Sequence, residues 1–224
     1  VTTWLPLNPP SDEIWEMTIG LVDEVNYEDV DIIFSALPIE IARECEERLG
    51  QYKPVISTAS AFRYEEDVPI LIPEVNKDHT ELINIQKEQR GWNGFVVPGP
   101  NCTTVGLVMS LKPIYEAFGL DWVIMVSMQA VSGAGYPGVA SYDITANVIP
   151  YIQKEEGKVK KETLKILGKL ENDKIINAPF KIDCKCNRVP SLDGHMESVF
   201  IKTEQPCDAN DIKAALREWP GFDP

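Results

Sequence analysis

The organisation of this chain depends on seven residues, Pro98-Gly99-Pro100-Asn101-Cys102-Thr103-Thr104. Proline lacks a backbone N–H and glycine gives the chain extra freedom, so regular structure is not expected before Asn101. Beyond Thr104 apolar residues recur at helical spacing, at Val105, Leu107, Val108, Leu111 and Ile114. Cys102 is therefore expected where a loop becomes the first turn of a helix. The free N–H groups and positive dipole end of that turn favour a thiolate, which makes Cys102 a candidate nucleophile.

Short apolar runs alternate with helical patterns ahead of this stretch. The expected strands are 31–36, 54–57 and 94–97, and the expected helices are 39–49, which Gly50 ends, and 78–90. Such alternation predicts an α/β half with a parallel sheet covered on both faces. Dinucleotide-binding units usually open with a strand, a Gly-rich turn and a helix. No Gly-x-Gly-x-x-Gly precedes Asp31, so either this half binds no dinucleotide or the chain begins after that turn.

The pattern changes beyond Cys102. The expected elements are a helix 103–118, a long strand 122–131, a glycine-rich loop 132–138, helices 141–150 and 159–169, strands 180–189 and 197–203, and a last helix 209–219. This pattern predicts an α+β region with a mixed sheet, and it places a domain boundary between 1–101 and 102–224. The strand 122–131 suggests a sheet face larger than these helices cover, and so a homo-oligomer.

Composition and charge exclude several classes of protein. The 224 residues are 44% hydrophobic and 25% charged, as in ordinary globular proteins. A net charge of −14 argues against nucleic acid and anionic membrane as partners, because both need a basic surface. No apolar run is long enough to cross a membrane. The five cysteines are an odd, irregularly spaced set and no signal peptide is evident, so a cytoplasmic location is expected.

Cys184-Lys185-Cys186 is predicted to occupy alternating positions on a strand and not to bind metal, because no second cysteine pair accompanies it.

A cysteine nucleophile needs a partner, and the chain has two histidines. His79 is expected to be exposed in the first turn of a helix. His195 lies in a turn between two expected strands, where catalytic groups are often presented, and is favoured as the partner of Cys102. Arg188 precedes it by seven positions and is either a carboxylate-binding residue or part of a surface ion pair. Arg63 follows a strand and is a candidate for binding an anion.

Several motifs together resemble one known family. They are Phe34-Ser35-Ala36-Leu37-Pro38, Ala59-Ser60-Ala61-Phe62-Arg63, Val68 to Asn76, Pro100-Asn101-Cys102-Thr103-Thr104, Met128 to Tyr136, and Cys186-Asn187-Arg188-Val189 with Asp193 to Ser198. In this order they resemble aspartate-semialdehyde dehydrogenase, in its archaeal and fungal branch. The resemblance covers nearly the whole chain. It implies a partial Rossmann-like parallel sheet followed by an α+β catalytic and dimerisation domain with a mixed sheet.

The resemblance also implies a reaction. It is the NADP-dependent reductive dephosphorylation of L-aspartyl 4-phosphate to aspartate semialdehyde and phosphate, in the biosynthesis of lysine, threonine and methionine. A homodimer or homotetramer is implied, and no metal. The implied catalytic residues are Cys102 as the nucleophile that forms a thioester, His195 as acid/base and Gln129 in positioning. The implied substrate contacts are Arg188 at the carboxylate, Glu155 at the amine, and Arg63, Asn101 and Lys158 at the phosphate. The residues implied beside the cofactor are Ser35, Ala36, Leu37, Ser132 and Gly133. Without the resemblance, residues 155–158 read as charge on a solvated face.

The sequence departs from the family at both ends. The Gly-rich turn and the C-terminal segment that returns to the nucleotide domain are not found, so the chain resembles an internal portion. Residues 1–101 then correspond to the C-terminal part of the NADP-binding domain, and 102–224 to a catalytic and dimerisation domain that is incomplete at its C-terminal end. Poor binding of NADP by the isolated chain is expected, and the preference between NADP and NAD stays open.

Other functions remain open at this stage. A malonyl-CoA reductase shares the scaffold and the thioester chemistry, and N-acetylglutamyl-phosphate reductase is more distant. Two alternatives come from other classes of protein. They are a Cys–His hydrolase or acyltransferase that uses no nucleotide, and a non-catalytic oligomerisation module.

Overall fold

The structure is a computed structural model that describes residues 11–221. Contacts divide the chain into two compact units, one ending at Asp31 and the other beginning at Ile32. In the first unit the described residues form three short helical segments, α1 (Asp12–Trp15), η1 (Val22–Glu24) and η2 (Tyr27–Asp29), none of which contains a buried residue. The second unit contains both larger sheets and every candidate residue.

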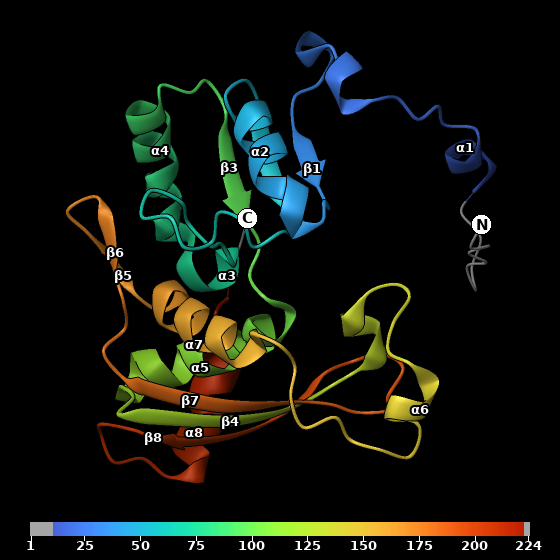
Figure 1. The fold of residues 1–224 in the computed structure, drawn as a ribbon. Helices are drawn as coiled ribbons and strands as arrows, with labels where there is room; N and C mark the ends of the chain where they lie inside the picture. Colours follow the sequence, from blue (N-terminus) through green and yellow to red (C-terminus); the bar gives the residue numbers. More distant parts are fainter. Residues whose placement is uncertain (1–10, 222–224) are drawn as a thin grey trace. The chain divides into compact units, whose positions relative to one another are not determined.

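The first sheet is parallel, with strand order β1-β2-β3 (Figure 1). Its strands are β1 (Ile33–Ser35), β2 (Pro54–Ser57) and β3 (Phe95–Pro98), joined through the helical segments α2 (Ile39–Gly50), α3 (Pro73–Asn76), η3 (Lys77–Glu81) and α4 (Leu82–Arg90). The predicted alternation of strands and helices is confirmed. The expected helix 78–90 is a 3₁₀ segment followed by α4, and Gly50 is the last residue of α2.

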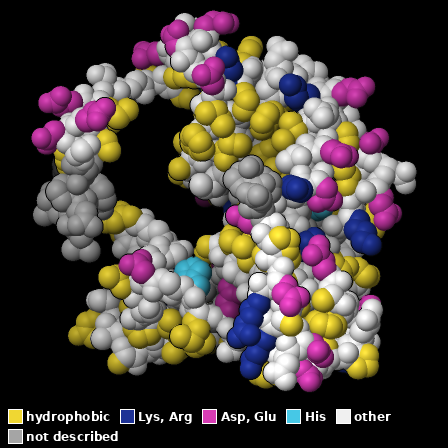
Figure 2. Space-filling model, turned by 180° about the vertical axis from the view of Figure 1, so that it is seen from behind, with side chains coloured by type: hydrophobic (Ala, Val, Ile, Leu, Met, Phe, Trp, Pro, Cys, Tyr) yellow, Lys and Arg dark blue, Asp and Glu magenta, His cyan; other side chains and the backbone are white. Residues whose placement is uncertain are grey.

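Apolar side chains remain uncovered on this half of the second unit. Figure 2 shows them gathered on the surface. Phe34 of β1 is 77% exposed, and Ile39 and Ile41 of α2 are about half exposed.

The second sheet is mixed, as predicted. Its central strand is β4 (Trp122–Gln129), which pairs in parallel with β7 (Lys181–Arg188) and antiparallel with β8 (Met196–Lys202). The inward residues of β4 join one hydrophobic core with α5 (Cys102–Phe118) and α7 (Glu155–Ile166), while α8 (Ala209–Glu218) packs against α5. In Figure 1, α5 and α7 lie between the two sheets.

Residues 130–176 differ from the sequence prediction. The glycine-rich loop contains the short η4 (Val131–Ala134). Of the expected helix 141–150 only α6 (Ser141–Ile144) forms, because Ala146 adopts a positive φ and Ile149 bridges to β7. The next helix begins at Glu155, not 159, and ends at Ile166. Beyond it β5 (Lys169–Glu171) and β6 (Lys174–Ile176) form a hairpin that the periodicity did not predict.

His79 is buried, so the prediction of an exposed side chain is wrong. It is 1% exposed, with Nδ1 2.9 Å from Asn76 Nδ2 and Nε2 3.2 Å from the Gly168 carbonyl oxygen. Burial lowers the pKa of the ring. A neutral ring that accepts from the Asn76 amide and donates to a carbonyl satisfies both nitrogens, so His79 joins η3 to the start of the hairpin.

Cys184 and Cys186 occupy alternating buried positions of β7, as predicted. Among residues 11–221, no helix combines the length and apolar character needed to cross a membrane.

Candidate active site

Cys102 is the first residue of α5, which confirms the predicted junction of loop and helix. Asn101 is the N-cap, and its side-chain oxygen accepts hydrogen bonds from the backbone N–H of Thr103 at 3.1 Å and of Thr104 at 3.3 Å. Asparagine suits this position because its side chain supplies the acceptor that the first turn lacks. The cap fixes the direction in which Cys102 leaves the loop.

His195 meets Cys102 from the other side. Its Nε2 atom lies 3.2 Å from Cys102 Sγ, and the backbone N–H of Ala130 donates to its Nδ1 at 3.2 Å. Because Nδ1 accepts, the neutral ring carries its proton on Nε2, the atom that faces the sulfur. Gly133 packs against the same ring: a Cβ there would lie 2.9 Å from His195 Cε1 and from Arg188 Nη1. Only glycine lets η4 approach so closely.

The surroundings of Cys102 and His195 shift both pKa values in the direction that favours the neutral forms. Burial raises the pKa of the Cys102 thiol, and the Glu155 carboxylate raises it further, although hydrogen bonds with Thr103 oppose this. Burial lowers the pKa of His195, and the Arg188 guanidinium lowers it further. Partial loss of solvation and the nearby carboxylate thus act against the helix dipole, which favours the thiolate.

Gln129 and Arg188 are opposite each other at the ends of the parallel strands β4 and β7. Gln129 is 1% exposed, and its amide nitrogen donates to Ser127 Oγ at 3.2 Å. Arg188 is also buried, and Nη1 donates to the Ala130 carbonyl at 2.7 Å. Within residues 11–221 the Arg188 guanidinium forms no ion pair, so the alternative of a surface ion pair is wrong. A buried cation near His195, with no ion pair among residues 11–221, suits an anionic ligand.

Glu155 and Lys158 lie in the first turn of α7. Glu155 is buried, and one carboxylate oxygen accepts from the Asn101 amide at 2.7 Å while the other is 3.9 Å from Lys158 Nζ. The interpretation of this segment as a solvated charged face is therefore wrong for Glu155. Lys154, with a φ of 63°, turns the chain so that Glu155 opens the helix against the N-cap of α5.

Arg63 lies beside the nucleophile. Its Nη1 is 3.0 Å from Glu162 Oε1, and Nη2 donates to the Thr58 carbonyl at 3.0 Å, whereas Nε is buried and has no partner among residues 11–221. A cavity of about 410 Å³ is lined by Ile39, Thr58, Ala59, Ser60, Arg63, Pro100, Asn101, Cys102 and Lys158. The structure thus brings the three residues expected at phosphate to the cavity that Cys102 lines.

Comparison with known proteins identifies the family. The family model described as "Semialdehyde dehydrogenase, dimerisation domain" matches residues 111–222, and "Semialdehyde dehydrogenase, NAD binding domain" matches residues 6–83. The chain belongs to the semialdehyde dehydrogenase family. Both parts of the predicted fold class, a nucleotide-binding α/β half and a half with a mixed sheet, are confirmed.

Individual members of the semialdehyde dehydrogenase family are similar over most of the chain. The aspartate-semialdehyde dehydrogenase of Archaeoglobus fulgidus is 51% identical over 196 residues, which are 87% of this chain and 57% of the relative. That of Methanothermobacter thermautotrophicus is 44% identical, over 94% of this chain and 61% of the relative. The structure of the Candida albicans enzyme with NADP has a TM-score of 0.85 and 32% identity, covering 96% of this chain and 63% of that one. The predicted resemblance to the archaeal and fungal branch is confirmed.

This member of the family spans about 60% of the length of the curated relatives it matches. A relative described as "Malonyl CoA reductase (NADP)", from Metallosphaera sedula, is 32% identical over 99% of this chain and 63% of the relative.

The residues expected beside the cofactor lie in two places. Ser35 ends β1, and its buried hydroxyl donates to Glu46 Oε1 at 2.6 Å, so it is bound within the protein interior. Ala36 and Leu37 follow it in the loop to α2, whose first residue Ile39 lines the cavity with Cys102. The other two, Ser132 and Gly133, belong to η4 beside His195 and Arg188.

Glu162 was missed by the sequence reasoning. It is fully buried and accepts hydrogen bonds from Arg63, Tyr64 and the backbone of Asn101. Its position seven residues after Glu155, two helical turns later, was an available signal that both carboxylates share one face of a helix.

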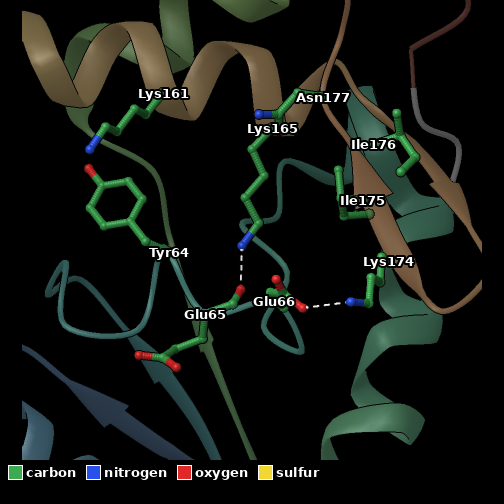
Figure 3. A pocket seen from close by; sticks show the side chains of 9 residues that line it. All are labelled: Tyr64, Glu65, Glu66, Lys161, Lys165, Lys174, Ile175, Ile176 and Asn177. Carbon is green, nitrogen blue, oxygen red and sulfur yellow. Dashed lines mark hydrogen bonds and ion pairs between the residues drawn. The ribbon is translucent and has the colours of Figure 1, made fainter.

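A second cavity, of about 520 Å³, lies between α7, β6 and the loop at Glu65 and Glu66 (Figure 3). Its lysines already have partners: Lys165 donates to three carbonyls, Lys174 is 2.9 Å from Glu66, and Lys161 lies 5.6 Å from the Tyr64 ring centre. Each of these lysines therefore has a contact within the protein, to backbone carbonyls, a carboxylate or an aromatic ring. In the part of the chain that the structure describes, no group of three His, Cys, Asp or Glu could hold a metal ion.

Proposed function

We propose that the protein containing this chain is an NADP-dependent aspartate-semialdehyde dehydrogenase, which converts L-aspartyl 4-phosphate to aspartate semialdehyde and phosphate. The observation that carries this proposal is the 3.2 Å approach of Cys102 Sγ and His195 Nε2 beside a cavity lined by Arg63, Asn101 and Lys158. The relatives named aspartate-semialdehyde dehydrogenase, at 51% and 44% identity, support this substrate over malonyl-CoA. The reaction serves the synthesis of lysine, threonine and methionine.

The pair Cys102 and His195 performs the chemical step in this proposal. The Cys102 thiol first releases its proton to solvent, and the resulting thiolate attacks the acyl carbon, so that a C–S bond forms and the C–O bond to phosphate breaks, and phosphate leaves with the electron pair. The Nε2–H of His195 donates to the oxygen on which negative charge develops. The Ala130 N–H at Nδ1 supports this role, because it opposes protonation of that nitrogen and keeps the donor on Nε2.

The surrounding polar residues bind the substrate. Arg188 binds the α-carboxylate, for which its unpaired, buried guanidinium is suited, and Glu155 binds the amine. Gln129 positions the acyl group from the end of β4. Arg63, Asn101 and Lys158 hold the phosphate, because all three line the cavity with Cys102.

The cavity is compatible with a nicotinamide cofactor. It extends to Thr58–Ser60, which follow β2, and to Ile39 at the start of α2. This is the carboxyl edge of a parallel sheet, where α/β proteins bind nucleotides. We propose that Ser35, Ala36, Leu37, Ser132 and Gly133 border the cofactor. When bound, NADPH supplies the hydride that reduces the thioester.

The domain division and the assembly complete the proposal. We place the boundary between the nucleotide-binding and catalytic halves at Asn101–Cys102, between the two regions that the family models match. We further propose that a homodimer or homotetramer forms through the face of the mixed sheet that is turned away from α5 and α7. There Ile124 of β4 is 47% exposed, and its register partner Phe200 of β8 is 63% exposed. Cytoplasmic location stays a prediction.

The complete protein tests the function by nicotinamide absorbance. With aspartate semialdehyde, phosphate and NADP we expect formation of NADPH, and with malonyl-CoA and NADPH we expect little oxidation. The Cys102→Ala variant should be inactive, whereas Cys207→Ala, at a partly buried cysteine bonded to Thr203, is the matched control and should retain activity. Faster turnover of malonyl-CoA would favour the reductase, and ester hydrolysis without any nicotinamide change would favour the hydrolase.

A further inference from the structure

Four charged residues follow one another along α7 at Glu155, Lys158, Glu162 and Lys165, with the three- and four-residue spacing of a single helix face. Lys158 lines the cavity beside Cys102, and Glu155 contacts Asn101, which also lines that cavity. The third, Glu162, is fully buried although it belongs to none of the roles given above.

Glu162 uses both carboxylate oxygens. Oε2 accepts the backbone N–H of Asn101 at 2.6 Å, while Oε1 lies 3.0 Å from Arg63 Nη1 and 3.2 Å from the Tyr64 hydroxyl. One carboxylate therefore ties the guanidinium on the loop after β2 to the backbone just before Cys102. We infer that Glu162 is a positioning residue, which sets the Arg63 guanidinium and the Asn101 cap for phosphate in the reaction proposed above.

The remaining donors of Arg63 show what this contact achieves. Glu162 accepts one hydrogen bond from Nη1 and the Thr58 carbonyl accepts one from Nη2, and in the described part of the chain the buried Nε has no partner. A guanidinium held in this way keeps a fixed orientation at the cavity that Arg63 lines together with Cys102. A buried carboxylate suits this task, because charge-assisted hydrogen bonds are short and directional.

Lys165, one turn further along α7, binds backbone carbonyls of the same loop. Its ammonium donates to the carbonyls of Arg63 and Glu65 at 2.8 Å and of Val68 at 2.7 Å, and Figure 3 shows it reaching from α7 toward the loop at Glu65. The loop is thus anchored independently of Glu162. What depends on Glu162 is the direction of the Arg63 side chain and of the Asn101 backbone.

The inference is tested in the complete protein with the Glu162→Gln variant. A glutamine has one acceptor oxygen in place of two, so its amide nitrogen faces another donor and one of the three contacts is lost. We expect the KM for phosphate to rise at least tenfold, with less than a twofold change in the KM for aspartate semialdehyde. An equal change in both, an unchanged KM for phosphate or a lower one would overturn the inference.

A second readout needs no turnover. Inorganic phosphate should slow alkylation of Cys102 by iodoacetamide, and Glu162→Gln should need at least ten times more phosphate for the same protection. This readout separates the inference from the proposed function, since protection is measurable even if no semialdehyde is turned over. Absence of protection in the unaltered protein, or equal protection in both proteins, would overturn the inference.

Two further variants control for loss of stability. Glu46 is equally buried and accepts from the hydroxyls of Ser35 and Ser57, so Glu46→Gln should destabilise the fold yet leave the phosphate requirement within twofold. If Glu162→Gln fails to fold, Glu162→Asp retains the charge but is one methylene shorter and cannot reach Arg63 and Asn101 together. The same phosphate-specific change is expected of it, and an unaltered phosphate requirement would contradict the inference.

Discussion

The ionisation of Glu197 should make the stability of this protein depend on pH. Glu197 lies on β8, two residues after His195, and a Cβ on Gly106 of α5 would be 3.5 Å from its carboxylate oxygen. Burial raises the pKa of this carboxyl from 4.5 to about 7. The side chain forms no hydrogen bond or ion pair with any of residues 11–221, so nothing offsets the lost solvation. Replacing Glu197 by glutamine removes the ionisation and keeps the shape.

The sign and size of the effect follow from the two pKa values. Between pH 4.5 and about 7 the unfolded chain releases this proton while the folded protein retains it, so the free energy of unfolding falls as pH rises through that window. A rise of about 2.5 in pKa corresponds to at most about 3.4 kcal/mol. Because the side chain is only partly buried, water screens the charge, and we expect about half of this value.

Urea unfolding at pH 5.5 and 8.5 measures the effect, since both values lie above the pI of about 4.6. Relative to the unaltered protein, Glu197→Gln should gain about 1 kcal/mol on going from the lower to the higher pH. The control Glu171→Gln, at an exposed position of β5, should show no such change. A difference between variant and parent that is the same at both pH values would refute the reasoning.

Three other perturbations test separate parts of the structure. The rate of Cys102 alkylation without phosphate should still increase above pH 8.5, because burial raises the thiol pKa. A rate that is constant above pH 7 would contradict this raised pKa. In thermal melts, Gly94→Ala should lower the free energy of unfolding by about 3 kcal/mol, because its Cβ would overlap the Lys53 backbone. Its control Gly157→Ala, whose Cβ would meet open space on α7, should raise the free energy of unfolding by about 1 kcal/mol. Phe200→Asp should convert the oligomer to monomer in light scattering with unchanged circular dichroism, and a monomeric parent protein would disprove the proposed interface.

The start of α5 and the order of the strands were predictable because their signals are local. Two prolines and a glycine, followed by asparagine and an apolar helical pattern, specify where the loop stops and the helix begins. Likewise, the Asn172-Asp173 turn of the β5–β6 hairpin has a local signal, two residues suited to positive φ, which hydrophobic periodicity alone does not use.

The electrostatics of the site could not be predicted in this way. The raised thiol pKa of Cys102 depends on burial and on Glu155, which is 53 positions away in the sequence. Burial of His79 depends on Asn76 nearby but also on the carbonyl of Gly168, which belongs to another element. Both properties follow from tertiary contacts that satisfy or withhold hydrogen bonds, and no local pattern encodes them.

Tertiary contacts also explain why the charge pattern of α7 does not reveal which of its residues are buried. In a strongly acidic chain a run of Glu and Lys is most simply a solvated face, yet Glu155 and Glu162 are buried and the Lys165 ammonium is bonded to three carbonyls. Buried charges are tolerated only when each is paired or hydrogen-bonded. Here the partners lie on the Arg63 loop and on the Asn101 cap, the two segments that border Cys102. The helix therefore cannot pack without setting the anion end of the site, so folding and the placement of the nucleophile depend on the same contacts.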